Sequence, residues 1–173
     1  MLLDLKTMTT APKAVLFVCL GNICRSPSAQ AIFSQNDTLG IAFDSAATGS
    51  HTTGQHPDPR AIQIGKEQGY NGLSNYQARQ VSLDDFDNFD IIFAMDKQNL
   101  ADLQSLQNKH HTIYPNEKTA HLLLLGDTKD QGAGTEIADP YYGDLDDFRA
   151  MFDELQALCQ IWQQNWQNKT LII

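Results

Sequence analysis

Short apolar runs that alternate with helix-like segments are the feature that most constrains the fold of this chain. Four runs have the composition of buried strands: Ala14–Val18, Ile41–Ser45, Ile91–Met95 and His121–Leu125. Helical patterns lie between and after these runs, over Pro27–Leu39, Pro57–Gln68, Asp96–Gln107 and Leu145–Gln167. This alternation predicts an α/β domain with a parallel sheet, because a parallel strand pair needs a crossover that is usually a helix.

Three of the expected helices have start signals. Ser26 stands directly before Pro27, and a proline is well tolerated in the first turn of a helix. The same arrangement occurs at His56 and Pro57, and Asp96 can cap the third helix with its carboxylate.

The last expected helix carries apolar residues at steps of three and four from Phe148 to Trp166. This spacing predicts that one helix face packs against the sheet. Cys159 belongs to that face and is interpreted as a buried small hydrophobic residue.

A length of 173 residues and an apolar fraction of 42% are typical of one globular domain. We expect a single domain over residues 13–167, a flexible N-terminal extension over residues 1–12 and a C-terminal tail over residues 168–173. No repeat divides the chain further.

Charge and cysteine content narrow the partners and the compartment. The formal net charge is −9, which opposes nucleic acid or an anionic membrane as a partner because both bind basic surfaces. No apolar run approaches the roughly 20 residues that a membrane-spanning helix needs. Three cysteines, an odd number, and no recognisable export signal favour reduced thiols and a cytoplasmic location.

The turn between the first expected strand and the first expected helix, residues 19–26, has the pattern of an anion-binding loop. Backbone N–H groups point inward where a turn meets a helix N-terminus, and the helix dipole adds positive potential there. Gly21 is expected to adopt a backbone angle that other residues resist. Asn22 is expected to brace the loop through its side-chain amide.

Cys19 begins this loop and Arg25 ends it, six residues later. N–H donors, Arg25 and the Ser26 hydroxyl would favour the thiolate of Cys19. The planar guanidinium of Arg25 can hold two phosphate oxygens at once. A nucleophile and a phosphate clamp are two needs of phosphoryl transfer, so the loop predicts that chemistry.

The motif CLGNICRSP, from Cys19 to Pro27, resembles the active-site loop of the low-molecular-weight protein tyrosine phosphatases. Further similar stretches are DPR from Asp58, ARQ from Ala78, FDIIFAMDKQNLADL from Phe89 and DPYYG from Asp139. Together they extend the resemblance over about residues 13–164.

The resemblance implies a three-layer domain with a four-stranded parallel sheet flanked by helices, and no metal or cofactor. It implies that Cys19 attacks phosphorus to form a phosphocysteine, that Arg25 holds the phosphate, and that Asp139 protonates the leaving group. The substrate would be a phosphotyrosine-containing protein or a small aryl phosphate.

The resemblance also implies the residues around the substrate. The loop residues expected to bind it are Leu20, Gly21, Asn22, Ile23, Cys24 and Ser26. Three residues beyond the loop are expected to form walls of the pocket: His51, Tyr141 and Tyr142. Ser45 and Asp96 are expected behind the loop, although a solvent-facing hydroxyl and a simple helix cap are the alternatives for these two.

The sequence departs from the family pattern at two positions. His51 stands where an aromatic residue is common, and Tyr76 stands where histidine is frequent. Ile23 occupies a position at which arginine phosphatases of the family tend to have threonine, which favours tyrosine as the phosphorylated residue. Cys24 is either a packed thiol or a partner that traps oxidised Cys19 as a disulfide.

Two other functions use a similar loop. A thiol-dependent arsenate reductase needs further cysteines to accept the disulfide, and the middle of this chain has none. A phosphopeptide-binding module would need Arg25 but neither Cys19 nor Asp139, and both are present.

Overall fold

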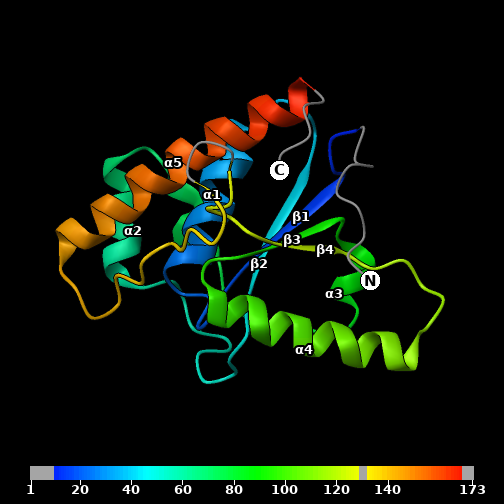
Figure 1. Cartoon of the computed structure of the whole chain (residues 1–173). Helices are drawn as coiled ribbons and strands as arrows, with labels where there is room; N and C mark the ends of the chain where they lie inside the picture. Colours follow the sequence, from blue (N-terminus) through cyan, green and yellow to red (C-terminus); the bar gives the residue numbers. More distant parts are fainter. Residues whose placement is uncertain (1–9, 129–131, 169–173) are drawn as a thin grey trace.

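The computed structural model describes residues 10–128 and 132–168 (Figure 1). A four-stranded parallel sheet runs through its centre in the order β2-β1-β3-β4. The strands are β1 (Ala14–Cys19), β2 (Ala42–Ala47), β3 (Ile91–Ala94) and β4 (His121–Leu124). The predicted α/β class and parallel sheet are confirmed, and each expected strand lies within two residues of its predicted bounds.

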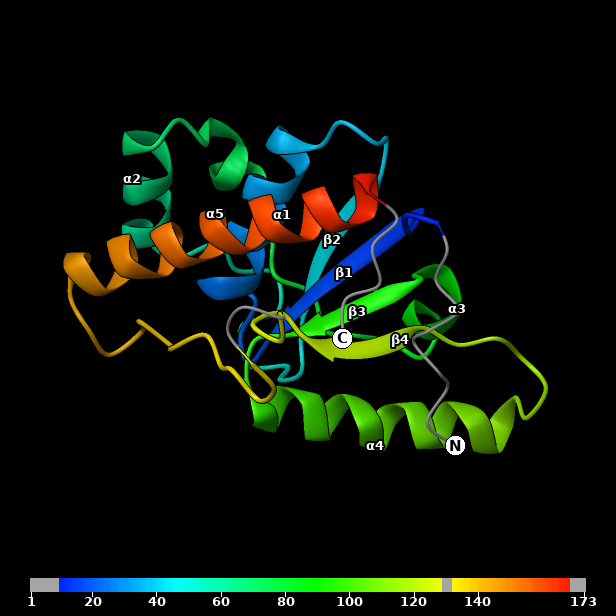
Figure 2. The ribbon, with the colours of Figure 1, turned by 45° about the horizontal axis from the view of Figure 1, so that its top comes forward.

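Helices cover both faces of the sheet and give three layers (Figure 2). One face carries α1 (Arg25–Asn36), α2 (Pro59–Glu67) and α5 (Leu145–Gln167). The other carries α4 (Lys97–Ile113) and the short α3 (Asp85–Asn88). A 3₁₀ helix, η2 (Asn71–Asn75), follows α2.

The alternation of side chains along β1 explains why both faces need a cover. Val15 and Phe17 belong to the cluster under α1 and α5, whereas Leu16 and Val18 belong to the cluster under α4. All four are fully buried, and each such side chain contributes roughly 1.5–3 kcal/mol to folding. The predicted apolar stripe of α5, including Cys159, lies in the first cluster.

Two predicted helix starts were wrong. Helix α1 begins at Arg25, so Ser26 lies inside it rather than capping it. Helix α2 is capped by Asp58, whose carboxylate accepts the Arg60 N–H at 2.8 Å, and not by His56. The prediction for Asp96 is confirmed, because its carboxylate accepts the N–H of Asn99.

Two helix ends also differ from the prediction. Helix α1 ends at Asn36 because the Asp37 carboxylate binds the N–H groups of residues 39–41 in a turn. Helix α4 continues to Ile113 and stops before Pro115, which disfavours a helical conformation at the residue preceding it.

The expected extension over residues 1–12 and the tail over residues 168–173 lie mostly outside the described residues, of which they include only residues 10–12 and 168. Within residues 10–128 and 132–168, no helix has the length and apolarity to cross a membrane.

Candidate active site

The loop between β1 and α1 encloses the sulfur of Cys19. Cys19 is the last residue of β1, and only 3% of it is exposed. Its Sγ atom accepts the backbone N–H of Asn22 at 3.2 Å and lies 3.1 Å from the hydroxyl of Ser26. Strand β1 thus delivers the thiol to the carboxyl edge of the sheet, beside the N-terminus of α1.

Asn22 has a strained backbone in this loop, with φ at +53°, the only positive φ of a non-glycine residue in the described chain. Gly21 does not have a positive φ, so the predicted backbone role of Gly21 was wrong and belongs to Asn22. The Asn22 side chain donates to the hydroxyls of Ser26 and Ser45, each at 2.8 Å, and accepts the N–H of Arg79 at 3.1 Å. These bonds hold the strained loop from below.

Ser45 extends this network away from the loop. It is 4% exposed, and its hydroxyl donates to the side-chain carbonyl of Gln30 at 2.7 Å while accepting from Asn22. The alternative of a solvent-facing hydroxyl at Ser45 is therefore excluded. Because Ser26 accepts from Asn22, its own proton has two acceptors within reach, the sulfur of Cys19 at 3.1 Å and the carbonyl of Ala46 at 3.4 Å.

Arg25 lies beneath the loop, 3% exposed, between two carboxylates. Its guanidinium donates to Asp96 at 2.7 Å, to Asp139 at 2.9 Å and to the carbonyl of Ile137 at 3.1 Å. Burial disfavours the charged guanidinium, but the nearby Cys19 and the two carboxylates outweigh it and raise the pKa of Arg25. Arg25 is therefore a permanent cation at the base of the site, and Asp96 is both a helix cap and its ion-pair partner.

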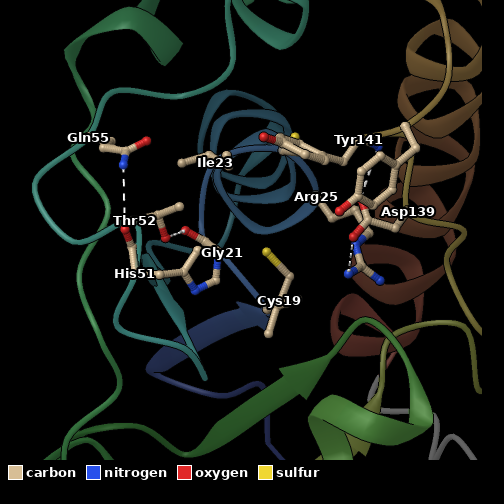
Figure 3. Close-up of a pocket in the computed structure, with 12 residues that line it drawn as sticks. Cys19, Gly21, Ile23, Arg25, His51, Thr52, Gln55, Asp139 and Tyr141 are labelled. Carbon is tan, nitrogen blue, oxygen red and sulfur yellow. Dashed lines mark hydrogen bonds and ion pairs between the residues drawn. The ribbon is translucent and has the colours of Figure 1, made fainter.

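A cleft of about 330 Å³ opens above the sulfur (Figure 3). The sulfur of Cys19 points into it, with Asp139 and Tyr141 on one side and His51 and Gln55 on the other. The residues that line the cleft are Cys19, Leu20, Gly21, Ile23, Cys24, Arg25, His51, Thr52, Gln55, Asp139, Tyr141 and Tyr142.

The structure brings most of the predicted site residues to this cleft. Four do not line it: Asn22, Ser26, Ser45 and Asp96. Asn22 and Ser26 contact the sulfur of Cys19 and Asp96 contacts Arg25, whereas Ser45 is joined to the cleft only through Asn22. Tyr76 is half-buried against the cluster under α1 and α5 and lies outside the cleft lining, and its backbone carbonyl contacts the ring of His56.

Several functional contacts were missed by the sequence analysis. Thr52 is buried and its hydroxyl donates to the carbonyl of Gly21, so the loop after β2 supports the loop between β1 and α1, residues 19–26, which is called the phosphate loop below. Arg60 binds the backbone of Tyr141 and Gly143. The sequence signal for Arg60 was the DPR motif, but the motif alone does not predict which residues Arg60 contacts.

The other two cysteines are buried and free. Burial, followed by the charge of Asp58, raises the pKa of Cys24 well above its usual value. Burial raises the pKa of Cys159 to about 12. Cys159 lies in the core on α5, which does not favour the arsenate reductase alternative because a disulfide relay needs an accessible second thiol.

The structure places a buried arginine and a thiol together at a helix N-terminus, at the positions the sequence analysis singled out. A profile of the family described as "Low molecular weight phosphotyrosine protein phosphatase" matches residues 14–171. The chain belongs to this family. The predicted family is thereby confirmed.

Relatives in this family match the chain nearly end to end. A Schizosaccharomyces pombe protein of this name is 38% identical over 84% of the chain and 92% of its own length. The one from Sus scrofa is 39% identical over 86% and 92%. A protein tyrosine phosphatase from Entamoeba histolytica, solved with Hepes in its active site, has a TM-score of 0.77 and 35% identity over 91% of this chain and 99% of its own.

Proposed function

We propose that this phosphatase hydrolyses phosphotyrosine and other aryl phosphate monoesters through a phosphocysteine formed on Cys19. The observation that carries the proposal is the placement of the Cys19 sulfur. It lies at the floor of an open cleft, within hydrogen-bond reach of a backbone N–H and the Ser26 hydroxyl, with Arg25 buried alongside. The similar proteins from Schizosaccharomyces pombe and Sus scrofa are named low molecular weight phosphotyrosine protein phosphatases, which supports the same substrate class for this chain.

In the first step the Cys19 thiolate attacks phosphorus, an S–P bond forms and the bond from phosphorus to the aryl oxygen breaks. The phosphate replaces the Asp139 carboxylate on Arg25, whose fork then binds the equatorial oxygens together with the N–H groups of the loop and leaves Asp139 able to hold a proton. Asp139 gives its proton to the departing oxygen, a contribution typically worth about 10²–10⁴-fold. It is 43% exposed and lies at the open side of the cleft.

In the second step water attacks the phosphocysteine and Asp139 takes a proton from that water. The S–P bond breaks, inorganic phosphate leaves and the thiolate of Cys19 returns. No redox change occurs, and apart from the substrate and the attacking water every group in both steps is a side chain or backbone atom of this chain. In the part of the chain described, no group of three His, Cys, Asp or Glu side chains is placed to hold a metal ion.

The cleft walls suit a flat aromatic ring. Ile23 and Leu20, the latter 48% exposed, supply apolar contact on the loop side, and Tyr141, 44% exposed, stands opposite. His51 is the polar wall where relatives commonly place an aromatic ring, so one face of the substrate ring stacks and the other meets an imidazole. A cytoplasmic site of action accords with the three free thiols.

The test is hydrolysis of phenyl phosphate, a phosphotyrosine peptide and the matched phosphoserine peptide in the presence of EDTA. The wild type should turn over the two aryl substrates and leave phosphoserine nearly untouched. Cys19→Ser should abolish turnover, while inorganic phosphate still binds to the variant. A wild type that binds phosphate without turnover would instead show a binding module.

A further inference from the structure

Arg60 stands outside the cleft lining yet contacts the backbone of the loop that carries Asp139. Its Nη1 donates to the carbonyl of Gly143 and its Nη2 to the carbonyl of Tyr141, both at 2.9 Å. Its guanidinium carbon lies 4.5 Å from the ring centroid of Phe148 and 5.8 Å from that of Tyr141. The guanidinium therefore fastens the downstream end of this loop.

Asp58 holds the Arg60 guanidinium in the orientation that these bonds need. Its carboxylate accepts from Arg60 Nε at 3.0 Å and from Nη2 at 2.7 Å, a two-point contact that fixes the plane of the fork. The same carboxylate caps α2 and is only 9% exposed. Asp58 also donates its backbone N–H to the carbonyl of Ile23 in the phosphate loop at 2.8 Å.

The contacts continue from Arg60 to the carboxylate of Asp139 through one residue. The carbonyl of Tyr141 accepts a hydrogen bond from Arg60, and the N–H of Tyr141 donates to the Asp139 carboxylate at 3.1 Å. The upstream end of the loop is held separately, by the Ile137 N–H on the carbonyl of Met95 and by Arg25, which donates to the Ile137 carbonyl and to Oδ2 of Asp139. The second carboxylate oxygen of Asp139, Oδ1, is the one bound by the Tyr141 N–H. Among the hydrogen bonds of the described residues, those of Arg60 alone join Tyr141 and Gly143 to segment 58–60. The same segment contacts Ile23 through the N–H of Asp58.

We infer that Arg60, oriented by Asp58, is a positioning residue that sets the Asp139 carboxyl against the leaving-group oxygen. This inference rests on the proposed role of Asp139 as the acid. Segment 58–60 contacts the loop of the nucleophile through Asp58 and the loop of the acid through Arg60. It thereby fixes the separation of the two groups that must act on opposite sides of one phosphorus atom. A misplacement of about 1 Å can cost about 10²-fold in rate, so such a tether matters to the acid step.

The test uses kcat/KM for a series of aryl phosphates whose leaving groups differ in pKa, because kcat/KM reports the steps up to phosphocysteine formation. Arg60→Met keeps the alkyl stem over Phe148 and removes every donor. It should lower kcat/KM for phenyl phosphate by about 10-fold or more, and for 2,4-dinitrophenyl phosphate, which leaves without a proton, by less than about 3-fold. Inhibition by inorganic phosphate should stay nearly unchanged, since Arg25 and the phosphate loop are untouched.

Two further variants make the test specific. Arg60→Lys keeps a charge for Asp58 but lacks the fork, and should show the same dependence on the leaving group. Arg149→Met is the matched control, because Arg149 also joins α2 to α5, through Glu67 and Asp146, and is 43% exposed. It should leave kcat/KM for both substrates within about 2-fold of the wild type.

Asp139→Asn separates failure of the inference from failure of the proposed function. If Asp139 is the acid, this variant shows the steep leaving-group dependence, and Arg60→Met adds less than about 2-fold to it. If Asp139→Asn shows the dependence but the two Arg60 variants lose equally on both substrates or lose nothing, the Arg60 inference is wrong. If Asp139→Asn itself lacks the dependence, the proposed acid is wrong and the Arg60 inference is overturned with it.

Discussion

At the residue scale, Cys19 and Cys24 are both buried but differ in what surrounds the sulfur. The Cys19 sulfur receives an N–H and faces a hydroxyl, whereas the pKa of Cys24 is raised by burial and by the charge of Asp58. A raised pKa keeps a thiol neutral at physiological pH, and the neutral thiol is a poor nucleophile. Of the two neighbouring cysteines, only Cys19 therefore has the surroundings that the proposed nucleophile requires.

This contrast predicts the order of alkylation. Iodoacetate at neutral pH should modify Cys19 and leave Cys24 and Cys159 unmodified, because burial raises the pKa of the latter two and holds them as thiols. Peptide mass spectrometry measures the modified sites, and inorganic phosphate should protect Cys19. Modification of Cys24 at a rate comparable with that of Cys19 would contradict this description of the loop.

Asn22 allows a second test at this scale. Asn22→Ala and Asn22→Gly both remove the amide that binds Ser26, Ser45 and the Arg79 N–H, so both should lose activity. The two variants differ in backbone strain, because glycine adopts φ = +53° without a steric cost and alanine does not. The glycine variant should be more stable by about 1 kcal/mol in urea unfolding. Equal stability would mean that the positive φ is not retained.

At the element scale, α5 contributes to the core and adjoins the loop that carries Asp139, called the acid loop here for the role proposed for Asp139. Its N-terminus has a capping box, in which Asp144 accepts the N–H groups of Asp146 and Asp147 while the Asp147 carboxylate accepts that of Asp144. Farther along, Trp162 packs edge-on against Phe93 of β3 with ring centroids 4.6 Å apart. The helix thus starts where the acid loop ends and is anchored on the sheet.

Removal of the cap should lower the stability of the protein. Asp144→Ala should lower the free energy of unfolding by about 1 kcal/mol, because two N–H groups of the first turn lose their acceptor. Asp153→Ala, at an exposed position in the middle of the same helix, should change it by less than about 0.5 kcal/mol. Chemical denaturation of the two variants provides the comparison, and equal effects would show that the capping box contributes nothing.

At the scale of the whole molecule, the charge of the protein opposes that of its proposed substrate. The formal net charge is −9, and exposed Asp144, Asp146 and Asp147 lie just beyond the acid loop. Arg25 at the base of the cleft provides local attraction, but it is paired with two carboxylates. A small dianion therefore approaches against the long-range field and is held only at contact.

Ionic strength should reveal this field. Between about 0.02 M and about 0.2 M salt, kcat/KM for phenyl phosphate should rise by about 2-fold, because salt screens the long-range repulsion. A phosphotyrosine peptide rich in lysine should show the opposite trend, since the same field attracts it. Steady-state kinetics at several salt concentrations measures both slopes, and a decrease for phenyl phosphate would show that Arg25 dominates at long range.

The strands, the phosphate loop and the family were accessible from sequence because each depends on neighbouring residues. Apolar runs set the strands, and the nine residues from Cys19 to Pro27 set the loop. The start of α1 was misjudged because the Ser26 hydroxyl, a good cap on local grounds, is engaged by the sulfur of Cys19. Helix α3, with four residues, is too short to show a periodic pattern.

Contacts between distant segments were not accessible in this way. Arg60 meets residues more than 80 positions away, and no local pattern encodes that pairing. The positive φ was assigned to Gly21 because glycine adopts it at no steric cost, whereas here the side-chain bonds of Asn22 compensate for the strain. The partners of Arg60 and the residue that takes the positive φ both depend on tertiary contacts, which a single sequence does not show.

The most direct test of the account is to trap the covalent intermediate. The Asp139→Ala variant, mixed with 2,4-dinitrophenyl phosphate and quenched in acid, should carry one phosphoryl group, because the good leaving group departs unaided while hydrolysis of the phosphocysteine lacks its base. Peptide mass spectrometry should place that group on Cys19, and the Cys19→Ser variant should carry none. A phosphoryl group on any other residue, or turnover by Cys19→Ser, would contradict the proposal that Cys19 is the nucleophile.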